Sequence, residues 1–262
     1  MAKLRLMCVL AHPDDESLGT GGTLAKYAAE GVETYLVTAT RGERGRFGDA
    51  GESPGPEVVG RVREAELCAA ARELGVCDVA VLGYGDGALD QADPIEAQKA
   101  ISRHIWRVKP HIVVTFGPEG AYGHPDHIAI CQLTTAAVVR ADHKVSKLYY
   151  MAWRKETWTA YQTALKTLRV MVDGAERLAA PWPDWAVTTV VETGAVWPAV
   201  WRAVSCHKTQ MAIYKRLEHL PEDQHRILWG TQEYYRVFSA VNGGRRLERD
   251  LFEGLRRKEG VK

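Results

Sequence analysis

The sequence lacks the features that mark secreted, membrane and nucleic-acid-binding proteins. Its five cysteines are odd in number, widely spaced and without a C-x-x-C pair, which argues against a disulfide framework. No uncharged apolar run is long enough to cross a bilayer, and too few apolar residues precede His12 for a signal peptide. Lys and Arg total 34 against 33 for Asp and Glu, so no charge excess indicates a nucleic-acid partner. We therefore expect a reduced, cytoplasmic protein that binds a small molecule.

Strand-like and helical patterns alternate over the first part of the chain. Each strand-like run and the helical pattern after it lie at residues 4–11 and 24–29, 32–40 and 57–74, 76–82 and 94–108, and 111–116 and 128–140. Such alternation predicts an α/β, Rossmann-like fold with a mostly parallel sheet flanked by helices. We expect one domain over 1–262, with an α/β core at 1–146 and an elaborated C-terminal part at 147–262.

The C-terminal part has a weaker pattern and many tryptophans. Segments 187–191 and 234–241 are predicted strands, and the charged tail at 245–262 is predicted to be a solvated helix end. Clustered Trp side chains most often pack against one another, with a subunit interface or a sugar-stacking surface as the alternatives.

Four loops follow the predicted strands, and in a parallel sheet they all lie at its carboxyl edge, where open α/β sheets form their ligand crevices. The loop at 41–56 is long and rich in glycine, so we expect it to border the site. Glycines at 19–22 match a dinucleotide fingerprint only loosely, and close helix packing is the preferred explanation for them.

Two clusters of ionisable residues follow two of these strands: residues 12–16 read His-Pro-Asp-Asp-Glu and residues 124–127 read His-Pro-Asp-His. A His-Pro-Asp triplet by itself is usually a turn. Two of them at one sheet edge favour a shared metal ion, for which His12, Asp15 and His127 supply two imidazoles and a carboxylate. This donor set suits Zn²⁺ and also Fe²⁺ or another divalent ion.

The remaining groups of the two clusters match the needs of a hydrolase. Asp14 is the candidate general base, with a helix N-cap as its alternative role, whereas Glu16 is expected to support the first helical turn. His124 is a candidate acid or oxyanion donor, and the Asp126 carboxylate is expected to hold its ring. Tyr122 could add a phenolic hydroxyl.

Both clusters, with Ala11 before the first and Gly123 before the second, resemble those of the PIG-L, or LmbE-like, zinc deacetylases over at least residues 4–140. The resemblance implies removal of the acetyl group from N-acetylglucosamine units. It also implies the following roles: metal ligands His12, Asp15 and His127; general base Asp14; acid or oxyanion aid His124; mobile tyrosine Tyr122; and substrate-binding residues Arg63, Asp86 and Glu43. From the residues alone, Arg63 and Asp86 could equally be salt-bridge partners.

The resemblance covers only one short run of the C-terminal part, His207-Lys208-Thr209-Gln210. In the family this part shapes the outer pocket and subunit contacts, and a homo-oligomer, a dimer or a hexamer, is therefore expected. Two alternatives stay open: an amidase acting on thiol conjugates or another small non-sugar amide, and a nucleotide- or sugar-binding module without catalysis.

Overall fold

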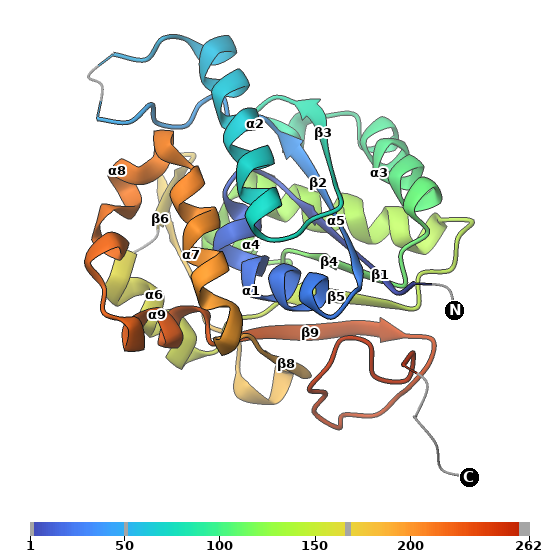
Figure 1. Ribbon diagram of the computed structural model, residues 1–262. Coiled ribbons are helices and arrows are strands. Elements are labelled where there is room, and N and C mark those ends of the chain that lie inside the picture. Colours follow the sequence, from blue (N-terminus) through green and yellow to red (C-terminus); the bar gives the residue numbers. More distant parts are fainter. Residues whose placement is uncertain (1–2, 50–51, 166–168, 257–262) are drawn as a thin grey trace.

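A seven-stranded sheet forms the centre of the molecule in the computed structural model, which describes residues 3–49, 52–165 and 169–256. The strand order is β3-β2-β1-β4-β5-β9-β8, and β9 alone runs against the others (Figure 1). The strands of this sheet are β1 (Arg5–Leu10), β2 (Glu33–Thr40), β3 (Asp78–Tyr84), β4 (Ile112–Thr115), β5 (Lys147–Met151), β8 (Thr189–Glu192) and β9 (Thr231–Ser239). The predicted Rossmann-like, mostly parallel α/β fold is confirmed.

Helices cover both faces of the sheet, and a separate hairpin follows α6. The longer helices are α1 (Asp15–Ala29), α2 (Pro56–Glu73), α3 (Pro94–Val108), α5 (Pro125–Arg140), α6 (Lys155–Leu165), α7 (Trp197–Cys206) and α9 (Glu222–Trp229). The shorter elements are α4 (Gly120–Gly123), α8 (Met211–Tyr214), β6 (Arg169–Val172) and β7 (Ala175–Leu178). None of the described helices is long and apolar enough to span a membrane.

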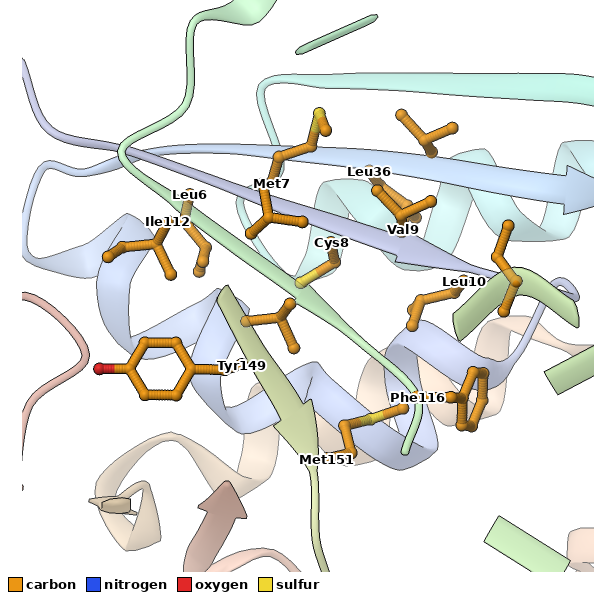
Figure 2. Packing of buried hydrophobic residues seen from close by; sticks show 14 of the residues in the cluster. Leu6, Met7, Cys8, Val9, Leu10, Leu36, Ile112, Phe116, Tyr149 and Met151 are labelled. Carbon is orange, nitrogen blue, oxygen red and sulfur yellow. The ribbon is translucent and has the colours of Figure 1, made fainter. Parts of the chain in front are cut away.

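The core is organised around β1, whose apolar run is buried on both faces of the sheet. Leu6 to Leu10 are fully buried and pack against residues of the neighbouring strands, among them Leu36 and Ile112 (Figure 2). A continuous apolar run is what a central parallel strand requires, because helices cover both of its faces. The first cluster of ionisable residues therefore leaves the core at a fixed point.

The first helix begins earlier than the sequence pattern indicates. We predicted a helix at 24–29 after a glycine-rich connection, whereas α1 starts at Asp15 and contains those glycines. A Cβ atom on Gly22 would lie 2.7 Å from the Cβ atom of Thr193, and one on Gly21 would lie 3.2 Å from Val200. The glycines thus permit close packing of α1 against the C-terminal part, as predicted.

The C-terminal part joins the same sheet. The predicted strands at 187–191 and 234–241 correspond to β8 and β9, while β5 was not predicted because its short, mixed sequence carries little periodicity. The predicted solvated helix at the tail is wrong for its described residues, since Glu248 is buried and bonds to Lys147 and Tyr149 at 2.6 Å. Residues 257–262 of that segment lie outside the described part.

The four loops at the carboxyl edge of the parallel strands and the helices of the C-terminal part meet at one end of the molecule. Figure 1 shows α6, α8 and α9 gathered beside the start of α1. Residues from α6 and α8 line one cavity together with residues that follow β1, β2 and β4. The predicted position of the site at this edge fits that arrangement.

Candidate functional site

The turn between β1 and α1 holds Asp14 in an unusual backbone conformation. Asp14 has a φ of 104°, which is sterically unfavourable for a residue with a Cβ atom and costs on the order of 1–3 kcal/mol. Its N–H donates to a Glu16 carboxylate oxygen at 2.9 Å. Glu16 therefore supports the first turn of α1, as predicted. Its other oxygen accepts from the buried His207 at 2.7 Å. Such strain, fixed by surrounding contacts, is typical of functional sites.

The predicted metal ligands converge on one point. His12 Nδ1 lies 3.2 Å from His127 Nε2 and 3.6 Å from Asp15 Oδ2, and His127 Nε2 lies 3.5 Å from Asp15 Oδ1. Ligands of a tetrahedral zinc ion, each about 2.0–2.1 Å from the metal, lie roughly 3.3 Å apart. These three residues therefore fit a single divalent ion.

The outer nitrogens of both histidines are held by acceptors, which determines where their protons lie. His12 Nε2 lies 3.0 Å from the Asp126 carboxylate and 3.2 Å from that of Asp86, and His127 Nδ1 lies 3.3 Å from the Gly120 carbonyl. With the protons on those nitrogens, the lone pairs of His12 Nδ1 and His127 Nε2 face each other. A shared cation satisfies this arrangement.

Electrostatics at the site also favour a positive charge. Burial acts to lower the pKa of His12, but hydrogen bonds to Asp126, Asp15 and Asp86 outweigh it and hold that pKa well above its usual value. Burial lowers the pKa of His127 to about 3. Burial acts to raise the pKa of Asp15, but the neighbouring histidines lower it overall. The carboxylates around His12 thus attract a proton or a metal ion.

Two further triplets around His12 bring ligand atoms within 4.8 Å of one another: His12 with His124 and His127, and His12 with Asp86 and Asp126. The second triplet uses the nitrogen of His12 that already donates to these carboxylates. It therefore fits the role of orienting the histidine better than the role of binding the ion.

The predicted contact between the Asp126 carboxylate and the His124 ring is wrong. That carboxylate accepts from His12 and from the N–H groups of Gly87 at 2.7 Å and Leu89 at 3.0 Å. His124 is instead the N-cap of α5, and its Nδ1 accepts from the Asp126 N–H at 3.2 Å. Asp126 follows Pro125, the first residue of α5, and from this position its carboxylate reaches His12 rather than its sequence neighbour.

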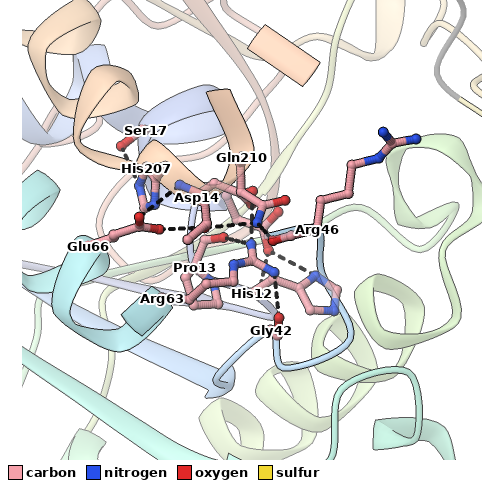
Figure 3. A network of polar contacts seen from close by, with 12 residues as sticks. His12, Pro13, Asp14, Ser17, Gly42, Arg46, Arg63, Glu66, His207 and Gln210 are labelled. Atoms are coloured by element: carbon pink, nitrogen blue, oxygen red, sulfur yellow. Dashed lines mark hydrogen bonds and ion pairs between the residues drawn. The ribbon is translucent and has the colours of Figure 1, made fainter. Parts of the chain in front are cut away.

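The Asp14 carboxylate is held from two sides. Its Oδ2 accepts from Arg63 Nη2 at 3.0 Å (Figure 3). The same oxygen accepts from the Tyr214 hydroxyl at 2.9 Å, and the carboxylate makes no N-cap bond. Arg63 also donates to the carbonyls of Gly42 at 2.7 Å and Pro13 at 2.5 Å. Both terminal nitrogens of Arg63 are therefore engaged by the protein, as its salt-bridge alternative predicts, although Arg63 also lines the cavity.

Asp86 and Glu43 form a supporting pair next to His12. Asp86 Oδ2 accepts from the Arg44 N–H at 2.9 Å, and Glu43 Oε1 accepts from the Asp86 N–H at 2.8 Å. Burial acts to raise the pKa of Asp86, but His12 outweighs it and brings the pKa to about 2. Asp86 lines the cavity, whereas Glu43 is not among the described residues that do so. Glu43 thus stabilises the backbone of the loop that carries Asp86.

The second cluster places two rings over the predicted metal position. The ring centroid of His124 lies 4.8 Å from those of His12 and His127, and Tyr122 contacts His124 edge-on at 5.9 Å. Ala121, the residue before Tyr122, has a φ of 63°, so the turn that carries Tyr122 is also strained. Burial lowers the pKa of His124 and raises that of Tyr122, which keeps the tyrosine hydroxyl protonated.

One cavity of about 440 Å³ is lined by every predicted site residue except Glu43 and Asp126. Sequence reasoning missed Tyr214, which comes from α8 and carries no motif. It noted the His207-Lys208-Thr209-Gln210 run only as a resemblance. In the structure His207 pairs with Glu16, and Gln210 lines the cavity and donates to the Arg46 carbonyl at 2.7 Å.

Comparison with known proteins gives matches over most of the chain. Residues 7–138 match the family model described as PIG-L: GlcNAc-PI de-N-acetylase. A 1D-myo-inositol 2-acetamido-2-deoxy-alpha-D-glucopyranoside deacetylase from Mycobacteroides abscessus is 36% identical over 236 residues, covering 81% of this chain and 84% of the relative.

Solved structures show the same fold at lower identity. The N,N'-diacetylchitobiose deacetylase from Pyrococcus horikoshii is 19% identical with a TM-score of 0.66, covering 89% of this chain and 83% of the other. The 4-carboxy-2-hydroxymuconate hydratase GalB from Pseudomonas putida is 20% identical with a TM-score of 0.67, covering 92% and 99%. Since a deacetylase and a hydratase share this fold, the chemistry has to be argued from the site.

Proposed function

This chain belongs to the PIG-L family and is an N-deacetylase of a GlcNAc-type substrate, and we propose that the cluster around His12 carries its reaction. The observation that supports this most is the convergence of His12 Nδ1, His127 Nε2 and the Asp15 carboxylate. The two nitrogens lie 3.2 Å apart, and each has one of the two Asp15 oxygens within 3.6 Å. Two imidazole nitrogens that lie 3.2 Å apart beside a carboxylate suit a shared divalent ion.

We propose zinc as the native ion, with Fe²⁺ as the alternative that metal analysis distinguishes. A bound zinc ion polarises a carbonyl oxygen and lowers the pKa of water to about 7. His12, Asp15 and His127 would hold it. Asp126, Asp86 and the Gly120 carbonyl would keep the two rings oriented through their outer nitrogens.

Asp14 is placed to act as the general base. Both of its donors, Arg63 and Tyr214, bond to Oδ2, and among the described residues no group hydrogen-bonds to Oδ1. Oδ1 can therefore accept a proton from the attacking water. Burial raises the pKa of Asp14 despite the opposing charge of Arg63, which brings its basicity closer to that required at neutral pH.

His124 is placed to donate a hydrogen bond to the reacting amide. Because its Nδ1 accepts from the Asp126 N–H, the proton of the neutral ring lies on Nε2. In this form His124 can stabilise the developing oxyanion through a hydrogen bond, and the proton that Asp14 takes from the water can then pass to the leaving amine. Tyr122 keeps its hydroxyl proton and can contribute a second donor at the same site.

The test combines metal analysis with turnover. The purified protein should contain about one divalent ion per chain, and a chelator should abolish release of acetate from N-acetylglucosamine glycosides until the ion is restored. His12→Ala should lose the ion. A protein that releases acetate from these glycosides equally well before and after chelation would contradict the proposed metal site.

The amidase alternative stays open because much of the cavity wall is apolar, and N-acetylated thiol conjugates belong in the same assay. A binding module without catalysis is disfavoured, since an inactive site has no need for a strained Asp14 held by two donors. The expected dimer or hexamer remains a prediction, which the mass of the protein in solution checks.

A further inference from the structure

The cavity that contains the predicted metal site is lined by two chemically different sets of residues. One set holds the ionisable groups described above. The other set holds Leu18 of α1, Trp153 after β5, three residues of α6 and Ile213 of α8. The three residues of α6 are Trp158, Tyr161 and Leu165. This set is called the apolar wall below.

The apolar wall is preformed. The ring centroids of Trp153 and Trp158 lie 5.9 Å apart, and Trp158 is stacked on Tyr161 at 6.5 Å with an interplanar angle of 15°. The Tyr161 hydroxyl donates to the Leu18 carbonyl at 2.6 Å, which ties α6 to α1. Trp158 and Tyr161 are buried, so a ligand finds these rings already ordered and loses little entropy on contact.

Three polar groups on and beside the apolar wall are already hydrogen-bonded within the protein, and the indole N–H of Trp158 is buried away from the cavity surface. The Tyr161 hydroxyl is bound to Leu18, the Tyr214 hydroxyl to Asp14, and the amide nitrogen of Gln210 to a backbone carbonyl. Sugars and cyclitols can stack a C–H face on a Trp ring, but the hydroxyls at the ring edge still need partners. Here they would meet mostly apolar aliphatic and aromatic side chains, and burying unpaired hydroxyls is unfavourable.

We propose that the apolar wall binds an alkyl or aryl group of the substrate, carried either on the anomeric oxygen of the amino sugar or as an N-acyl chain longer than acetyl. This inference rests on the proposed function, and it names the substrate class that this chain prefers. The relatives are named for a substrate whose second ring is inositol, which carries a hydroxyl on every carbon. An apolar wall is poorly matched to such a ring.

The test compares two matched substrate series. One series holds methyl, octyl and phenyl glycosides of N-acetylglucosamine, and the other holds methyl glycosides of glucosamine with acetyl or octanoyl on nitrogen. Each methylene that enters the wall improves binding by about fourfold. We therefore expect kcat/KM to rise by at least about tenfold either from the methyl to the octyl glycoside or from the acetyl to the octanoyl amide. The series that shows the rise identifies where the apolar group is carried. No rise in either series overturns the inference.

Variants test whether the gain comes from the apolar wall. Ile213→Asn places an amide at a position that is 40% exposed, so the fold should tolerate it, and it should lower the octyl-to-methyl ratio. Ile227→Asn changes an isoleucine that is 62% exposed and outside the cavity lining, so that ratio should stay unchanged. Trp153→Ala provides a second test, with the 65% exposed Trp106→Ala as its control. Equal ratios in each variant and its control overturn the inference.

Binding without turnover separates this inference from the proposed function. The octyl glycoside of N-acetylglucosamine, added to chelator-treated protein, should quench tryptophan fluorescence and bind at least about tenfold more tightly than the methyl glycoside. If the protein binds the octyl glycoside in this way but releases no acetate from any glycoside after the metal is restored, the result supports binding by the apolar wall and contradicts the deacetylase function. If the protein releases acetate from the methyl glycoside but binds the octyl glycoside no more tightly, the result supports the deacetylase function and overturns the inference about the wall.

Discussion

Replacing Tyr214 with phenylalanine tests how the general base is held. In the wild-type protein the Tyr214 hydroxyl donates to Asp14 Oδ2 at 2.9 Å, and Arg63 donates to the same oxygen at 3.0 Å. Burial and the charge of Asp14 raise the pKa of Tyr214, so the phenol keeps its proton and acts as a donor. Tyr214→Phe removes this donor and leaves the arginine, so the carboxylate can rotate about a single remaining contact.

The expected loss follows from the strength of the hydrogen bond. A hydrogen bond to a charged group contributes about 1.5–3 kcal/mol, which corresponds to roughly 10- to 100-fold in rate if the transition state depends on it. We expect kcat to fall by this factor while KM and metal content change less than about twofold. The hydroxyl is already bonded to Asp14, and none of the predicted metal ligands hydrogen-bonds to it.

The pH profile should shift with a definite sign. A donor to the ionised form of a carboxyl lowers its pKa, so removing Tyr214 should raise the pKa of Asp14. The acidic limb of kcat/KM should therefore move to higher pH, by about one pH unit or more. Tyr234→Phe is the matched control, since it removes a buried hydroxyl that contacts Thr23 at 2.6 Å, away from the cavity. An unchanged kcat and acidic limb in Tyr214→Phe would refute the proposed support of Asp14.

Three further predictions address the base, the tail and the packing of α1. Asp14→Asn should keep its metal, measured by elemental analysis, and lose roughly 10²- to 10⁴-fold in acetate release; retained turnover would exclude its role as base. Burial acts to raise the pKa of Glu248, but its hydrogen bonds lower it overall, so its stabilisation is present above the unfolded-state value of 4.5 and is lost as pH falls through the folded value. Glu248→Gln should therefore lower Tm most at neutral pH, with a difference that shrinks below pH 4.5; a difference independent of pH would argue against ionised Glu248. Gly22→Ala should destabilise by about 1–3 kcal/mol in urea unfolding, because the new Cβ atom meets Thr193 at 2.7 Å, while Gly243→Ala, with open space around it, should change little; equal effects would contradict the packing argument.

The sequence allowed the convergence of His12, Asp15 and His127 to be predicted because each group follows a strand with a clear apolar pattern. Residues that follow neighbouring parallel strands meet at one sheet edge whatever the details of packing, so His12 and His127 could be paired without a structure. The same reasoning failed for Asp126. Its partner depends on the turn into α5, where His124 becomes the N-cap and the Asp126 carboxylate reaches His12.

Local sequence also misplaced the start of the first helix. Glycines usually interrupt helices, so a run of them before residue 24 indicated a connection. In the structure they lie within α1, because the close approach of the C-terminal part leaves no room for a side chain at Gly22. The stabilisation gained from this packing outweighs the weak helix propensity of glycine, a comparison that only the folded chain reveals.

The sequence by itself determined the α/β fold, the edge of the sheet where the site forms and the pair of clusters that meet there. These features depend on residues close together in the chain and on the geometry common to all parallel sheets. The tertiary structure decided which nitrogens of His12 and His127 face each other, which donors hold Asp14 and which apolar residues complete the cavity lining. Asp14 and Tyr214 are 200 residues apart, and contacts over such separations arise only when the whole core packs, so no local pattern encodes them.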